Sequence, residues 1–100
     1  MGTVHRLEEQ VGRLVSNTVS APTAVAVLEH IVRSIVDHPD DVKVNSVDDE
    51  EGVILEVHVA PGDLGRVIGR RGRTAMSIRT VVRAAAARDG VDVDVDFVDD

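Results

Sequence analysis

The segment that most constrains the fold lies near the C-terminus, where apolar and acidic residues alternate. Residues 91–97 place three valines and Phe97 on one side of an extended chain and Asp92, Asp94 and Asp96 on the other. The apolar side requires burial, whereas the row of carboxylates requires water. This strand therefore predicts a sheet that is covered on one face and at least partly open on the other.

Three helices are predicted before this strand. Apolar residues at helical spacing indicate a first helix that Thr23 caps and that ends before Pro39. A second helix of about two turns is expected from the spacing of Leu64, Val67 and Ile68, and it ends at Gly69. A third, longer helix begins after Gly72 and stops at Gly90, a residue that favours helix ends.

Two further strands are predicted between the first two helices. Alternation with a period of two indicates strands at residues 41–47 and 53–59, which the acidic turn 48–52 joins as an antiparallel hairpin. Two helices then separate the second strand from the third, and such a crossover favours parallel, right-handed pairing. The predicted fold is α+β, with the order α-β-β-α-α-β and a three-stranded mixed sheet that carries its helices on one face.

The N-terminal residues are predicted to be an appendage, residues 1–21, to a single domain at residues 22–98. Leu7, Val11, Leu14 and Val15 recur at helical spacing, which is typical of an amphipathic helix. Glycine within this stretch weakens the pattern. The appendage is therefore expected to be either helical or frayed.

Composition restricts the function classes. The chain has no cysteine, which excludes disulfides, thiol catalysis and cysteine-ligated zinc. It has no apolar run long enough to span a membrane, so we expect a cytoplasmic protein. No catalytic constellation is present, and we expect no enzyme activity. We expect no cofactor and no metal, because the four histidines are scattered over different elements without ligand spacing: His5, His30, His38 and His58.

Charge is distributed very unevenly along the chain. The net charge is −7, yet residues 66–88 contain seven of the eleven basic residues, all arginine, and no acidic residue. The remainder holds four basic and eighteen acidic residues. Because screening removes the effect of distant charge beyond about 10 Å, a phosphate near this segment would experience the local positive charge. The alternative to phosphate binding is that these arginines form an ordinary solvated helix face.

The candidate binding residues surround two glycines inside this basic segment. Gly69 and Gly72 bracket two arginines at the junction of two predicted helices, where glycine permits unusual backbone angles and close approach of a ligand backbone. The following helix offers unpaired N–H groups and the positive end of its dipole. The candidate residues are Arg66, Val67, Ile68, Gly69, Arg70, Arg71, Gly72 and Arg73.

A G-x-x-G sequence alone is weak evidence, but its setting here resembles a KH domain of the type II arrangement. The run from Val59 to Thr80 and the segment Asp37–Val42 are similar to the small stand-alone KH proteins of bacteria, the KhpA (YlqC) family. The resemblance covers about residues 23–98. It implies that residues 69–72 contact the sugar-phosphate backbone of single-stranded RNA and that Val67 and Ile68 form an apolar floor beneath the bases. Ile54 or Glu56 could line the opposite wall.

The resemblance also implies partners and a cellular role. Members of this family are RNA-binding proteins that form homodimers and associate with a larger KH-containing protein of the Jag/KhpB type. They are linked with post-transcriptional regulation or RNA chaperoning, and with cell elongation and division. The resemblance therefore implies a general RNA binder. With one Phe and no Tyr or Trp, the chain lacks stacking platforms, so we expect mainly electrostatic recognition of low sequence specificity.

The sequence alone leaves two questions undecided: the role of two further arginines and the choice between two functions. Arg79 and Arg83 lie one helical turn apart, and they either extend the RNA track or pair with acidic groups of a protein partner. The competing function is a KH-fold dimerisation or adaptor module whose main role is to bind a protein. The two arginines of the loop favour RNA, because an adaptor has no need of them.

Overall fold

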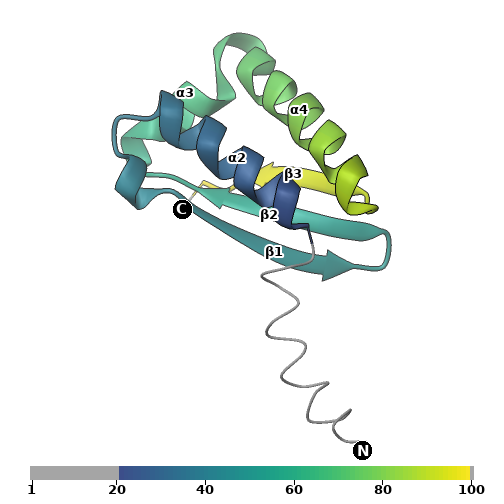
Figure 1. Ribbon diagram of the computed structural model, residues 1–100. Coiled ribbons are helices and arrows are strands. Elements are labelled where there is room, and N and C mark those ends of the chain that lie inside the picture. Colours follow the sequence, from purple (N-terminus) through teal and green to yellow (C-terminus); the bar gives the residue numbers. More distant parts are fainter. Residues whose placement is uncertain (1–20, 100) are drawn as a thin grey trace, which may run out of the picture.

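The computed structural model describes residues 21–99, and its elements occur in the predicted order (Figure 1). The predicted appendage, residues 1–21, lies outside the described residues except for Ala21. The helices and strands are α2 (Pro22–Ile35), β1 (Lys43–Asp49), β2 (Gly52–His58), α3 (Leu64–Ile68), α4 (Arg73–Asp89) and β3 (Val93–Phe97).

The three strands form one mixed sheet with the order β1-β2-β3. β1 pairs with β2 in antiparallel fashion, and β3 pairs with β2 in parallel fashion, as predicted. The hairpin differs from the prediction in its boundaries, because β1 runs on through Asp49, which pairs with Gly52. The acidic residues do not end the strand, since they lie exposed on the edge strand β1, where their carboxylates keep contact with water.

The helices α2 and α4 cover one face of the sheet (Figure 1). On the other face Asp94 and Asp96 are exposed, as the alternation in the last strand predicted. The parallel register places Asp96 opposite Glu56 of the central strand, so two carboxylates are neighbours on this open face. Like charges placed directly opposite each other are unfavourable unless water screens them, and this face must therefore remain solvated.

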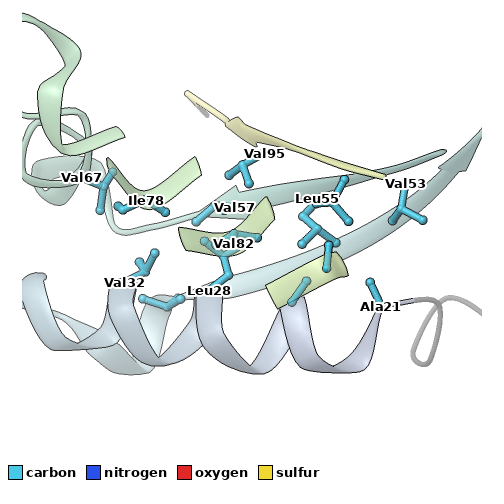
Figure 2. Close-up of a cluster of buried hydrophobic side chains, with 14 residues drawn as sticks. Ala21, Leu28, Val32, Val53, Leu55, Val57, Val67, Ile78, Val82 and Val95 are labelled. Carbon is cyan, nitrogen blue, oxygen red and sulfur yellow. The ribbon is translucent and has the colours of Figure 1, made fainter. Parts of the chain in front are cut away.

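The core between the helices and the sheet consists of aliphatic side chains (Figure 2). Leu28 of α2 and Leu55 of β2 are the largest fully buried members, and burying such a side chain contributes roughly 1.5–3 kcal/mol. The single aromatic residue, Phe97, is only partly buried at the margin of this cluster. β1 contributes no buried side chain. The buried core residues come from α2, β2, α3, α4 and β3: Ala24, Leu28, Val32, Val53, Leu55, Val57, Val67, Ile78, Val82, Ala86, Val93 and Val95.

The first turn of α2 is capped by a residue far away in the sequence. The prediction that Thr23 caps this helix is wrong, because the helix begins at Pro22 and Thr23 lies inside its first turn. The backbone N–H groups of Thr23 and Ala24 each donate to Oδ2 of Asp89, at distances of 3.1 Å. Asp89 is the last residue of α4, so its carboxylate joins the end of one helix to the positive end of another.

This contact lowers the pKa of Asp89. Burial by itself would raise the pKa, but the hydrogen bonds from Thr23 and Ala24 outweigh it and stabilise the ionised form. The Asp89 carboxylate therefore contributes its full stabilisation above the ordinary carboxyl pKa of about 3.9. This stabilisation is lost as the pH falls through the lower pKa that Asp89 has in the folded state.

Replacement of Asp89 by asparagine should lower the free energy of unfolding at neutral pH, because an amide oxygen accepts these hydrogen bonds less strongly than a carboxylate. The difference from the wild-type chain should shrink towards zero in strong acid, where Asp89 is protonated. Urea denaturation of both chains over a range of pH measures this difference. A difference that stays constant from neutral to acidic pH would contradict the capping role.

Candidate nucleic-acid interface

The junction of α3 and α4 has an unusual backbone. α3 ends at Gly69, whose φ of 77° and ψ of 175° lie in a region that is essentially restricted to glycine. Arg71 and Gly72 then both adopt the left-handed conformation, with φ of 57° and 73°, before α4 begins at Arg73. The chain therefore passes from α3 into α4 within four residues through backbone angles that favour glycine, as the two glycines predicted.

Gly69 also lacks room for a side chain. A Cβ atom at this position would overlap Oγ1 and Cβ of Thr74, a residue in the first turn of α4. At Gly72 a Cβ would meet no atom within 4 Å, so only its backbone angle favours glycine. The close contact between Gly69 and Thr74 fixes the shape of the loop, while the open space beside Gly72 leaves its outer surface accessible.

Arg71 occupies its left-handed conformation without being glycine, asparagine or aspartate. It is the only non-glycine residue of the described chain with a positive φ. This conformation costs an ordinary side chain roughly 1–2 kcal/mol. Such local strain tends to occur at functional sites.

The arginines of the loop present unneutralised charge. Arg70, Arg71 and Arg73 are exposed, and within residues 21–99 none of them forms an ion pair or a side-chain hydrogen bond. No side chain caps the N-terminus of α4, so N–H groups of its first turn remain available to an acceptor. Three guanidinium groups and the positive end of a 17-residue helix therefore converge on one exposed loop.

The other predicted contacts divide into two groups. Val67 is fully buried in the core, so its side chain supports the loop from below and does not offer a surface to a base (Figure 2). Ile68 is partly exposed and can still contribute apolar surface. Arg66 is paired within the chain, because its Nη2 lies 3.0 Å from Oδ2 of Asp37.

Arg79 and Arg83 both reach β3, the strand at the edge of the sheet next to α4. Their Nε atoms donate to the carbonyl oxygens of Val95 and Val93, at 3.1 and 3.4 Å. Arg79 also lies over the ring of Phe97, with 5.3 Å between its Cζ and the ring centroid. Each of these two side chains therefore links α4 to the edge strand β3.

Arg83 is in addition paired with Asp94, and both side chains are exposed. The strand beside the basic helix is thus β3 and not β2, which is the central strand. Ile54 and Glu56, which were suggested to line the wall opposite the loop, lie on this central strand, and that assignment stays a prediction.

One charged residue of this region had no assigned role in the sequence prediction. Asp63 is only 1% exposed and is the one buried charged residue of the described chain. It directly precedes α3, yet its side chain does not cap that helix. Its carboxylate instead accepts the backbone N–H groups of Asp37 and His38, at 3.2 and 2.9 Å. An aspartate before a short helix is the only sequence signal, and it would have suggested an ordinary cap.

The hydrogen bonds explain how a buried carboxylate remains charged. Burial raises the pKa of Asp63, but the hydrogen bonds from the backbone of Asp37 and His38 and from the His38 ring outweigh it, and the pKa lies below its ordinary value. Nδ1 of His38 lies 3.2 Å from Oδ2 of Asp63 and donates when it carries the proton.

The described part of the chain lacks the features of two other classes of site. Within residues 21–99, no three His, Cys, Asp or Glu side chains are grouped so that they could hold a metal ion. None of the helices described has both the length and the apolar character needed to cross a membrane.

The element order, the pairing of the sheet and the loop between α3 and α4 define a KH domain of type II. Residues 25–97 match the family model of the KH domain of KhpA and KhpB. The chain belongs to this family.

The similarity extends over nearly the whole length of known relatives. The chain is 59% identical over 73 residues to the RNA-binding protein KhpA of Leifsonia xyli, covering 73% of this chain and 93% of that protein. It is 58% identical over 72 residues to the RNA-binding protein KhpA of Streptomyces coelicolor, covering 72% and 90%. The RNA-binding protein KhpA of Clostridium acetobutylicum is 49% identical over 71 residues, with 71% and 95% covered.

The two glycines of the loop should differ in their tolerance of a side chain. Gly72→Ala should cost about 1–2 kcal/mol, because alanine is disfavoured in the left-handed conformation but meets no neighbour. Gly69→Ala should cost about 3 kcal/mol or more, because a glycine-only conformation is combined with overlap at Thr74. Chemical denaturation measures both values. An equal or smaller loss for Gly69→Ala would show that the contact with Thr74 does not fix the loop.

Proposed function

We propose that this protein binds single-stranded RNA and grips its sugar-phosphate backbone with the loop Gly69–Gly72. The observation that carries the proposal is the exposed cluster of Arg70, Arg71 and Arg73 at the start of α4, which has no neutralising partner within residues 21–99. The relatives named RNA-binding proteins support the same assignment.

The proposed binding mode follows from the geometry of the loop. A phosphate that approaches Gly72 meets no side chain there, so it can reach the N–H groups at the start of α4. Arg70, Arg71 and Arg73 then supply forked, charge-assisted hydrogen bonds to phosphate oxygens. The bases would extend from the loop along α4 towards the edge strand β3, with Ile68 as an apolar contact.

Sequence specificity should be low. Phe97, the only Phe, Tyr or Trp of the chain, is partly buried and lies beneath Arg79, so it offers no open surface on which a base could stack. Recognition therefore depends mainly on phosphate contacts, which carry no sequence information and weaken with salt.

The cellular role we propose is that of a post-transcriptional regulator or RNA chaperone of the cytoplasm, linked to cell elongation and division. This role follows from the family. It requires a binding surface and no catalytic step, cofactor or metal.

Reversing the charge of the loop should remove RNA binding without unfolding the domain. The variant Arg70→Asp with Arg71→Asp should lose about tenfold or more in affinity per arginine, because each charge-assisted hydrogen bond contributes about 1.5–3 kcal/mol. Fluorescence anisotropy with a labelled pool of random-sequence single-stranded RNA measures this loss, and circular dichroism verifies folding.

A matched control separates the loop from the overall charge. Arg33→Asp with Lys43→Asp changes the net charge by the same amount at two exposed positions on other elements, α2 and β1, and it should bind RNA nearly as the wild type does. If the loop variant binds with unchanged affinity at physiological salt, or if both variants lose affinity equally, the loop is not the binding site.

We also propose that the protein forms a homodimer and associates with a larger KH protein of the Jag/KhpB type. The observation that favours a protein partner is the exposure of two apolar side chains on opposite flanks of α4, Met76 at 58% and Val81 at 47%. A module devoted mainly to partner binding is the second candidate function, and these exposed side chains are what support it. Arg79 and Arg83 are less suited to a partner, because they already contact β3.

Light scattering at micromolar concentration should therefore give twice the mass of the chain. Val81→Asp should weaken the dimer by about tenfold or more, because a carboxylate would be buried without a partner. Val47→Asp makes the same change at an exposed position on β1 and should leave the mass unaltered. A monomeric wild-type chain, or equal effects of the two substitutions, would contradict this assignment.

A further inference from the structure

The short helix that leads into the RNA-binding loop cannot hold its own position. α3 has only five residues, and isolated helices of this length are unstable in water. Its one fully buried side chain is Val67, near the end that adjoins Gly69, whereas Leu64 at the other end is only partly buried against the core. The other end of α3 therefore needs a second attachment if the helix is to present the loop in one orientation.

Asp63 provides an attachment at that end. It closes the turn Pro61–Asp63 that precedes α3, and its carboxylate accepts two backbone N–H groups from the connection between α2 and β1. The bonds go to main-chain donors, which cannot rotate away as side chains can. A carboxylate buried in this way must remain hydrogen-bonded, since an unpaired buried charge is very costly.

Arg66 reinforces the same junction from the solvent side. Its Nη2 lies 3.0 Å from Oδ2 of Asp37, and its Nε lies 3.9 Å from Oδ1 of Asp63. The side chains of Arg66 and Asp37 are both more than half exposed, so this ion pair adds little on its own. Its geometry nevertheless ties the middle of α3 to the residue whose backbone Asp63 already holds.

We propose that Asp63 is a positioning residue for RNA binding: by fixing α3 against the α2–β1 connection, it holds the loop Gly69–Gly72 ready for the phosphate backbone. This inference rests on the proposed function. A loop that is already ordered loses less conformational entropy on binding, so the benefit of Asp63 appears in the affinity for RNA. Arg66 then acts through the junction and not as a phosphate contact.

The test compares Asp63→Asn with a core variant of similar stability loss. Val53→Ala removes buried apolar volume at the end of the core opposite Val67, far from the loop (Figure 2). Both should melt below the wild type. At a temperature where all three chains are folded, Asp63→Asn should bind the random-sequence RNA pool about threefold to tenfold more weakly, and Val53→Ala should bind as the wild type does.

Two further readouts separate positioning from stability. In Asp63→Asn, amide hydrogen exchange should accelerate more at residues 69–72 than in the core. In Val53→Ala, exchange at residues 69–72 should not accelerate more than exchange in the core. The salt dependence of RNA binding should keep its slope in Asp63→Asn and in Arg66→Gln, because the phosphate contacts in the complex are the same. A reduced slope in Arg66→Gln would show that Arg66 contacts phosphate directly and would overturn its assigned role.

A second variant serves if Asp63→Asn does not fold. Asp37→Pro removes one of the two N–H donors together with the carboxylate that pairs with Arg66, so it weakens both attachments of α3. The preceding Val36 is extended, with φ of −95° and ψ of 161°, as proline requires of its neighbour. This substitution should weaken RNA binding in the same direction.

The inference is overturned if the Asp63 or Asp37 variant and Val53→Ala bind RNA equally well. In that case the charge reversal at Arg70 and Arg71 would still abolish binding if the proposed function is correct. If the wild-type chain does not bind the RNA pool at all, the proposed function fails and this inference fails with it.

Discussion

The constraint on which the structure depends is an interior made of aliphatic side chains on one side of a three-stranded sheet. Leu28, Leu55 and the surrounding valines fill this layer, and the only aromatic ring stays at its margin. So small a core can fully bury only one residue of α3, Val67. Apolar contacts alone therefore do not fix every element, and hydrogen bonds are needed as well. This explains why two carboxylates, Asp63 and Asp89, accept hydrogen bonds from elements that are distant in the sequence.

The charges of the domain are separated by its architecture. The open face of the sheet carries Glu56, Asp94 and Asp96, whereas the loop between α3 and α4 carries arginines without partners in the described chain. An acidic face repels a polyanion, so RNA should approach from the side of the loop. Arg79 and Arg83 show that membership of a basic segment does not define a binding residue, because both are engaged with β3.

Much of the fold followed from local patterns, and the exceptions other than the extended end of β1 share one cause. The alternation at residues 91–97 predicted a one-sided sheet, and helical spacing with glycine stops predicted the elements in order. The cap of α2 could not be predicted, because Asp89 lies 66 residues from Thr23. The ion pair between Arg66 and Asp37 and the full burial of Val67 could not be predicted for the same reason. Periodicity places a residue on a face of its own helix but does not reveal which distant group it meets.

The central claim is that the loop Gly69–Gly72, and not the open face of the sheet, is where RNA binds. Nuclear magnetic resonance of the isotopically labelled chain, titrated with single-stranded RNA, tests it residue by residue. The largest amide shift changes should fall on residues 69–74 and decline along α4 and β3, while Asn45, Glu56 and their neighbours on the open face stay unchanged. Shift changes concentrated on that face, with the loop unaffected, would contradict the account.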